Sequence, residues 1–254
     1  MPTRTGSIPL VFLVSFLILA IGGCASSGTS RGPQDRFTFV TLTSGPTSGS
    51  GTPETRQAMF KGHMANINRL AESGDLLMAG PFSKPTDPTW RGLFIMDADP
   101  ERSRELVATD PGVISGEFTP LFRPIEASTT LRQSLSLYRA LEAESNAAPA
   151  DPSAPPMLMR PYVIIIADDA RRMHHALGAA NLAVVFRARF LDGNARGGLF
   201  VLDATDVAAV RAVLTDGGPC TVDGWFSSAS HVRLPEAVRA EKPLNPQPQQ
   251  APSR

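Results

Sequence analysis

His63 is the residue whose position in the sequence most suggests chemistry. The apolar residues around it follow the three- and four-residue spacing of a buried helix face: Phe60, Met64, Ile67 and Leu70. His63 lies at the edge of that stripe. An imidazole titrates near neutral pH, so it could exchange a proton with a ligand. It could also be a helix-edge residue hydrogen-bonded to a neighbour, and the spacing leaves both interpretations open.

Cys24 is the second candidate, because of the segment that precedes it. Residues 8–23 are almost wholly apolar but short for a membrane span, which is typical of a secretory signal. The run "AIGGC" resembles the bacterial lipobox, whose Cys is acylated and becomes the new N-terminus. We therefore expect lipid attachment at Cys24. An ordinary cleaved signal and an uncleaved anchor remain alternatives.

The lipid would place the protein in the cell envelope. The polar residues after Cys24 predict a flexible tether. Ala25 favours the outer membrane facing the periplasm, by resemblance to bacterial sorting rules, and the inner membrane or cell surface stays possible. Of the two cysteines, only Cys220 would keep a free thiol, which excludes an internal disulfide. A small, partly buried Cys220 is favoured over a reactive one.

Several other kinds of chemistry find no support. Adjacent residues on a helix point about 100° apart, so His174 and His175 make a poor metal pair, and we expect no metal and no other cofactor. No glycine-rich loop has the Lys and hydroxyl residue that cradle phosphates. The 24 basic and 24 acidic residues balance, which argues against nucleic acid as a partner.

The elements that would position His63 follow the order strand, helix, strand, strand, helix, strand. The pattern predicts a strand at 36–42, a helix at 53–73 that ends before Gly74, a strand that ends at Gly80-Pro81, a strand at 91–98, a helix capped by Asp99, and a closing strand at 115–126. This is the split βαβ plan of a ferredoxin-like domain.

The same plan recurs further along the chain. "GLFIMDA" at 92–98 returns as "GLFVLDA" at 198–204, and "GEF" at 116–118 returns as "GWF" at 224–226. Ordered matches of this kind indicate a duplication. Between the copies, apolar spacing predicts a helix at 129–144 capped by Ser128, followed by a Pro/Ala linker.

The first copy resembles the YCII-related domain family. The resemblance is carried by "HMANINRLAESGDLLMAGPF", "GLFIMDA" and "TDPGVISGEF". It implies a dimeric α/β barrel of two facing four-stranded sheets, with a His–Asp dyad in a cleft. In this sequence the resemblance places His63 and Asp110 at the positions of the family's dyad. Gly80 and Pro81 would shape a turn beside that pocket.

The second copy departs from the family pattern and is expected to be degenerate. Aligning Phe82 with Phe190 places Arg171 opposite His63, and "AGPF" becomes "ARF". Because two sheets then occur in one chain, we predict an α+β protein with two ferredoxin-like domains packed as an intramolecular pseudo-dimer, and hence a monomeric chain.

The expected function is that of a membrane-anchored protein that binds a small molecule or acts on it by acid–base chemistry of an isomerase or lyase kind. The alternative is a non-catalytic envelope protein with a structural or protein-interaction role. The expected segments are a signal peptide at 1–23, a lipidated tether at 24–35, a first domain at 36–127, a helix and linker at 128–160, a degenerate second domain at 161–237 and a disordered tail at 238–254.

Overall fold

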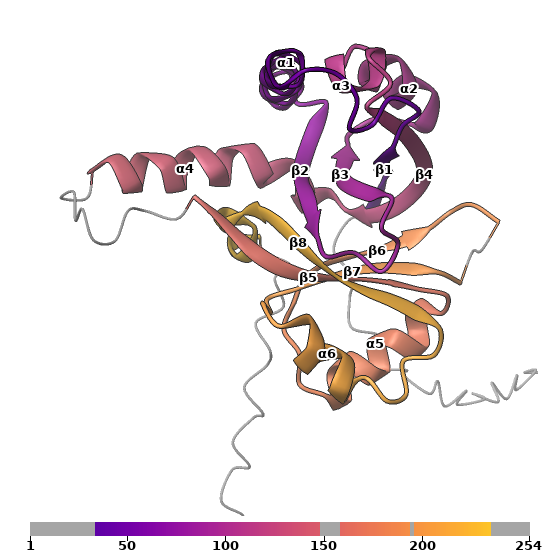
Figure 1. The fold of residues 1–254 in the computed structure, drawn as a ribbon. Helices are drawn as coiled ribbons and strands as arrows, with labels where there is room; N and C mark the ends of the chain where they lie inside the picture. Colours follow the sequence, from indigo (N-terminus) through magenta and orange to yellow (C-terminus); the bar gives the residue numbers. More distant parts are fainter. Residues whose placement is uncertain (1–33, 148–157, 194–195, 235–254) are drawn as a thin grey trace, which may run out of the picture. The chain divides into compact units, whose positions relative to one another are not determined.

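The computed structural model describes residues 34–147, 158–193 and 196–234 (Figure 1). The first half contains β1 (Gln34–Ser44), α1 (Pro53–Glu72), β2 (Leu76–Ser83), β3 (Trp90–Met96), α2 (Pro100–Val107), the short α3 (Pro111–Ile114) and β4 (Phe118–Ser128). A 3₁₀ helix, η1 (Thr129–Gln133), leads into α4 (Ser134–Ala147). The second half contains β5 (Met159–Ala167), α5 (Ala170–Ala179), β6 (Val184–Phe190), β7 (Gly198–Leu202), α6 (Val207–Val213), β8 (Cys220–Ser228) and the 3₁₀ helix η2 (Ala229–Arg233).

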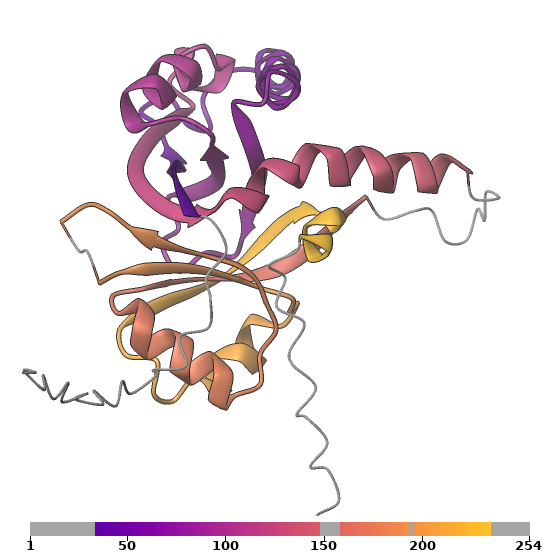
Figure 2. The same ribbon diagram turned by 180° about the vertical axis from the view of Figure 1, so that it is seen from behind.

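Within the described residues, eight antiparallel strands close into a barrel in the order β1-β3-β2-β8-β5-β7-β6-β4. Each half contributes four consecutive strands of that order, β4-β1-β3-β2 and β8-β5-β7-β6, which is the strand order of the split βαβ plan. Both views place α1 and α2 on one side of the strands and α5 and α6 on the opposite side (Figure 1 and Figure 2). The helices therefore cover the outside of the barrel.

The halves meet at two seams between strands. At one seam Phe82 of β2 lies opposite Trp225 of β8. At the other Ile125 of β4 lies opposite Phe190 of β6. Gly80 permits the first seam, because a Cβ at this position would lie 2.0 Å from the carbonyl oxygen of Phe226. A side chain here would hold the two strands apart.

One apolar core fills the barrel and draws on both halves. It includes Phe37, Phe39 and Ile125 from the first half and Tyr162 and Trp225 from the second. Separate clusters lie under the helices of each half. Because neither sheet could bury its inner face alone, the two halves form one structural unit. The structure thus confirms the predicted α+β fold, with two ferredoxin-like halves joined as an intramolecular pseudo-dimer.

The strand ladders also correct one predicted repeat. In each half, one residue of the first strand (β1 or β5) pairs on one side with the last residue of β3 or β7 and on the other side with a residue of β4 or β8. The latter residue is Pro124 in β4 and Gly224 in β8, so the two positions are equivalent. The offset on this strand is therefore 100 positions, from 124 to 224. The predicted equivalence of Gly116–Phe118 with Gly224–Phe226 is wrong, since the first segment enters β4 and the second lies inside β8.

The buried face of α1 differs from the predicted one. The residues that it buries are His63, Asn66 and Leu70. Phe60 and Met64, predicted to be core residues, are 57% and 42% exposed. The three-four spacing does not identify the buried face, because His63 and Asn66 are polar and are buried by pairing with other polar groups. His63 is thus on the packed face of the helix rather than at its edge.

Other boundaries agree closely with the sequence analysis. Thr52 caps α1 and Pro53 is its first residue, while Gly74, with φ of 84°, follows its end. Asp99 caps α2 as predicted. β2 continues to Ser83, so Gly80 and Pro81 lie inside a strand and the predicted turn there is wrong. The predicted helix after β4 is divided into η1, capped by Ser128, and α4.

Several predicted segments lie outside the described residues: the signal peptide, Cys24, most of the tether, the centre of the Pro/Ala linker and the tail. β1 begins at Gln34, so the last two positions of the predicted tether lie in this strand. Among the helices that the structure describes, none combines the length and apolar character needed to cross a bilayer.

Candidate functional site

His63 and Asp110 form a buried pair on the outer face of the first half's sheet. Nδ1 of His63 lies 2.9 Å from Oδ1 and 2.8 Å from Oδ2 of Asp110. The His63 residue is 7% exposed and Asp110 is fully buried. A carboxylate at this distance accepts a hydrogen bond from Nδ1, so the neutral ring carries its proton there and Nε2 has a free lone pair. The predicted approach of the two side chains is confirmed.

Asp110 is held in place by its neighbours as well as by His63. It caps α3 rather than ending α2, and its Oδ1 accepts a hydrogen bond of 2.8 Å from the backbone N–H of Gly112. The side chain of Asn66 donates to Oδ2 over 3.2 Å. Burial raises the pKa of the Asp110 carboxyl, but the hydrogen bond and charge of His63, with the bonds from Asn66 and Gly112, outweigh it and leave this pKa below its usual value.

A second layer of polar contacts fixes Asn66. Its side-chain oxygen Oδ1 accepts hydrogen bonds from Arg69 over 2.7 Å and from the hydroxyl of Thr109 over 3.1 Å. This orients the amide so that its NH₂ group faces Asp110. The order of contacts from Arg69 through Asn66 to Asp110 and His63 leaves the imidazole little freedom to turn.

Aromatic rings surround the imidazole of His63. Phe94 stacks on it with ring centroids 6.1 Å apart and planes 22° apart, and Phe118 lies at 5.2 Å. Gly112 is needed for this packing, because a Cβ there would lie 2.5 Å from the Phe118 ring. The lack of a side chain at Gly112 admits Phe118 beside the His63 ring.

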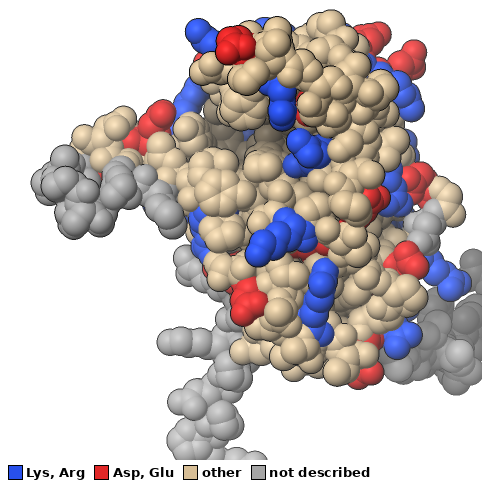
Figure 3. All heavy atoms as spheres, in the orientation of Figure 1, with Lys and Arg blue, Asp and Glu red and all other residues tan. Residues whose placement is uncertain are grey.

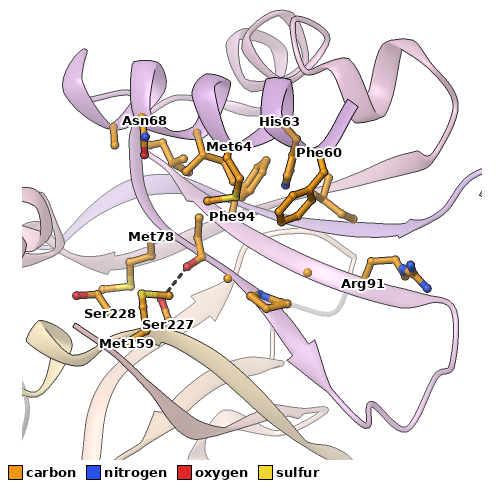
Figure 4. Close-up of a pocket in the computed structure, with 18 of the residues that line it drawn as sticks. Phe60, His63, Met64, Asn68, Met78, Arg91, Phe94, Met159, Ser227 and Ser228 are labelled. Atoms are coloured by element: carbon orange, nitrogen blue, oxygen red, sulfur yellow. Dashed lines mark hydrogen bonds between the residues drawn. The ribbon is translucent and has the colours of Figure 1, made fainter. Parts of the chain in front are cut away.

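A cavity of about 1050 Å³ opens beside His63. Its lining comes from α1, β2, β3, α4 and the end of β8 with η2. The close-up shows a ring nitrogen of His63 pointing into it, with Phe60, Met64 and Phe94 around the imidazole (Figure 4). In the part of the chain that the structure describes, Nε2 of His63 has no hydrogen-bond partner. The cavity therefore meets the basic edge of the ring.

Gly80 and Pro81 line this cavity, although they do so from within β2. Arg91 and Glu117 bring charge to the wall near them, with 3.8 Å between Nη2 of Arg91 and Oε1 of Glu117. Arg91 is partly exposed, while Glu117 is buried and also accepts from Ser48 and Gly49. Arg91 is therefore a residue that could meet an anionic group of a ligand. On the face of Figure 3, charged side chains lie among a largely uncharged surface.

Among the described residues of the second half, no His–Asp pair occupies the equivalent position. Arg171, which the alignment places opposite His63, is exposed. The buried residues on this helix are Met173, Ala176 and Leu177. Met173 packs against Gly217, and the side chain of Arg172 donates to the backbone oxygen of Asp216. Apolar packing thus replaces the His–Asp contact in this half.

No pattern in the sequence predicts the far wall of the cavity. This wall consists of α4 residues, Met159 and the second-half residues Ser227, Ser228 and His231. They are distant in the sequence from His63 and belong to no motif. A Ser and a His at these positions carry little information by themselves.

The remaining candidates form no site. Cys220 is exposed, so the predicted partial burial is wrong. His174 and His175 lie near each other on α5, with centroids 6.1 Å apart. In the described ranges, no group of three or more His, Cys, Asp or Glu side chains is placed to hold a metal ion.

Comparison with known families identifies the first half. Residues 38–121 match the model of the YCII-related domain. The match spans β1 through the beginning of β4 and includes His63, Gly80, Pro81 and Asp110. The chain therefore contains one YCII-related domain, within an α+β barrel whose other strands come from the second half. No curated protein and no solved structure matches the chain.

Proposed function

We propose that this protein binds a small molecule in the cavity beside His63 and that the His63–Asp110 pair acts on it as a general base. The observation that carries the proposal is that the two ring nitrogens of His63 have different surroundings. Nδ1 is occupied by a buried carboxylate, while the opposite edge of the ring faces a cavity (Figure 4). A base needs this geometry, because the nitrogen that takes the proton must reach the ligand.

The chemistry follows from the same contacts. Nε2 would remove a proton next to a carbonyl group, and the Asp110 carboxylate would stabilise the imidazolium that forms. Returning the proton elsewhere on the molecule gives an isomerisation, and loss of a leaving group gives an elimination. The aromatic and aliphatic lining suits a largely apolar molecule, and Arg91 could hold an anionic substituent.

A crystal of the protein soaked with a library of small carbonyl compounds tests this function. We expect density for a ligand within hydrogen-bonding distance of Nε2 of His63, and loss of that density in His63→Gln. His175→Gln is the matched control, because His175 is exposed on α5 and lies away from the cavity. A cavity that stays empty across the library, or ligands whose binding ignores His63→Gln, would contradict the proposal.

We further propose that the chain is a lipoprotein of the cell envelope, acylated at Cys24 and facing the periplasm from the outer membrane. The apolar run before "GGC" supports this placement. Cys24→Ser should move the protein from the membrane pellet to the soluble envelope fraction. Unchanged pelleting together with an unmodified N-terminal peptide by mass spectrometry would exclude lipid attachment.

We propose that the second half is a degenerate copy of the YCII-related domain and serves as a built-in partner. The equal strand order of the two halves and the recurrence of "GLFIMDA" as "GLFVLDA" support a duplication. With both seams closed inside one chain, we expect a monomer, which light scattering of the protein in solution would report. A non-catalytic envelope role is the competing function, and an unliganded cavity in the soaked crystals would favour it.

A further inference from the structure

The apolar stripe of α1 lines the cavity instead of the barrel core. Phe60, Met64 and Ile67, whose spacing predicts a buried helix face, all belong to the cavity wall. Phe60 and Met64 are 57% and 42% exposed. Contiguous apolar surface that a folded protein leaves open marks a place where another molecule binds. The stripe therefore indicates a ligand that lies along the helix.

The dimensions of the cavity limit the shape of that ligand. Its lining includes both the first residue of α1, Pro53, and the last, Glu72, so the cavity extends along the whole helix. A helix of 20 residues is about 30 Å long. The volume of about 1050 Å³ spread over that length gives a mean cross-section of about 35 Å². A protein helix, about 10 Å in diameter, is too wide for this space. A long, thin molecule fits it.

The wall opposite α1 keeps flat surfaces away from the stripe. It includes Met78 of β2 and Met159 of β5, which Figure 4 shows across the cavity from Phe60 and Met64. Methionine side chains adapt to the shape of what they contact. A bilayer surface or a folded partner could not enter between these two walls, whereas a hydrocarbon chain could.

The two ends of the cavity differ in charge. Near the start of α1, Arg56 and Arg91 line the cavity and are exposed. The carboxylate beside them, Glu117, is buried, already accepts from Ser48 and Gly49, and lies 3.8 Å from Nη2 of Arg91. The end of α1 and the facing part of α4 contribute more acidic than basic residues: Glu72, Arg139 and Glu142. An anionic group is therefore attracted to the arginine end and repelled from the other.

We propose that the cavity binds a single hydrocarbon chain with a carboxylate head, the chemistry of a fatty-acid anion. The carboxylate lies at the open end, beside Arg56 and Arg91, and the chain runs along Phe60, Met64 and Ile67. Every CH₂ group that leaves water for the apolar lining adds to the affinity. The exposed stripe would thereby be covered.

His63 would meet this chain away from its head. It lies seven residues after Arg56 on α1, about 10 Å along the helix. Nε2 of His63 would therefore face the chain several carbon atoms from the carboxylate. The inference rests on the proposed function in taking the cavity as the ligand site. It deepens that function, because the carbonyl group beside the transferred proton would be a second one, within the chain.

A series of straight-chain carboxylates tests the inference: octanoate, decanoate, dodecanoate and tetradecanoate. Equilibrium dialysis of the labelled compounds compares nanodiscs that hold the full chain with empty nanodiscs of the same lipid, so the excess bound is known at each free concentration. We expect binding to tighten about two- to fourfold for each added CH₂, the range for a partly to fully buried methylene. The methyl ester of dodecanoate, which has no charge, should bind about three- to tenfold more weakly than dodecanoate.

Variants at the two ends separate the head from the chain. Arg56→Gln/Arg91→Gln should abolish the preference for dodecanoate over its ester. Arg102→Gln is the matched control, because Arg102 is exposed on α2 and does not line the cavity. Met159→Gln, which keeps the size of the side chain at the far end, should weaken the binding of tetradecanoate and leave that of octanoate unchanged.

An affinity that does not rise from octanoate to tetradecanoate, equal binding of acid and ester, or a preference that survives the double arginine variant would each overturn the inference. Absence of binding by the whole series would overturn it too, and phospholipid retained on the protein in native mass spectrometry would then assign the cavity to a two-chain lipid. None of the probes has a second carbonyl group within its chain. These outcomes therefore leave the proposed function to be decided by the soaked crystals.

Discussion

Nδ1 of His63 lies 2.8 Å from Oδ2 of Asp110, although the two residues are 47 positions apart in the chain. Their approach depends on contact between α1, which carries His63, and α3, which Asp110 caps. Gly62 allows the helices to come together, because a Cβ at this position would lie 2.9 Å from the Pro111 ring. The pair is thus built into the packing of the first half and is not a chance surface contact.

The first prediction concerns the tautomer of His63. Because a carboxylate accepts from Nδ1, the neutral ring should carry its proton on Nδ1, which ¹⁵N chemical shifts of the two ring nitrogens report directly. Asp110→Asn removes the charge but keeps a side-chain oxygen that can still cap α3 through Gly112. We expect a mixed tautomer population in this variant, with little change in the fold. A protonated Nε2 in the unmodified protein would contradict the assigned hydrogen bond.

The second prediction tests which face of α1 is buried. Leu70→Ala should lower the free energy of unfolding by about 2–5 kcal/mol, the usual loss for a buried leucine, because Leu70 is fully buried beneath the helix. Phe60→Ala should cost less than about 1 kcal/mol, because Phe60 is more than half exposed and lines the cavity. Denaturant titrations of both variants give the comparison. If Phe60→Ala lowered the free energy of unfolding by more than Leu70→Ala, Phe60 would belong to the buried face, as the apolar spacing predicts.

The sequence was sufficient for the order of elements and for the pseudo-dimer, because these depend on local patterns. Capping residues such as Thr52 and Asp99 fix where helices begin, and short apolar runs bounded by turns indicate strands. Two copies of one plan in a single chain then leave few ways to cover both sheets. The family resemblance supplied Asp110 as the partner of His63, which the spacing alone could not do.

The sequence was insufficient where burial depends on pairing between distant residues. Phe60 and Met64 have the hydrophobic character of core residues, yet the polar His63 and Asn66 occupy the buried face because Asp110 binds both. The far wall of the cavity could not be predicted either. Ser227 and His231 reach it only because β8 pairs with β2 across the seam, and no local pattern encodes that contact.

The third prediction concerns the closure of the barrel at Gly80. Gly80→Ala would place a methyl group 2.0 Å from the Phe226 oxygen and 2.9 Å from Nε1 of Trp225, so β2 and β8 would have to separate. We expect a loss of more than about 3 kcal/mol or failure to fold, the range typical of severe strain in a packed interior. The loss would appear as a lower melting temperature in circular dichroism.

Gly178→Ala is the matched control for this change. A Cβ on Gly178 meets nothing within 4 Å, and the residue lies near the end of α5. The same substitution should therefore stabilise the protein slightly, by up to about 1 kcal/mol, because alanine favours the helix. Similar melting temperatures for Gly80→Ala and the unmodified protein would show that the strands tolerate a side chain at the seam.

The fourth prediction concerns the pH dependence of stability that His231 introduces. Its pKa is lowered to about 4 by burial in the folded protein, against an ordinary value of 6.5 for the exposed ring. The unfolded chain therefore binds a proton at higher pH than the folded one. The stability associated with neutral His231 is complete above 6.5 and is lost as the pH falls towards 4, by about 3 kcal/mol in total. Asp110 contributes a loss of stability only at lower pH, below its ordinary pKa of 3.8, because its pKa is lowered in the folded protein. As the pH is lowered from 7 to 4, the free energy of unfolding should fall more steeply for the unmodified protein than for His231→Leu.

His175→Gln is the control for this prediction. It alters an exposed histidine and should keep the steep slope. Parallel curves for the unmodified protein and His231→Leu would mean that His231 takes up its proton without disturbing the fold, and that its ring is not confined as its stacking on Trp225 indicates.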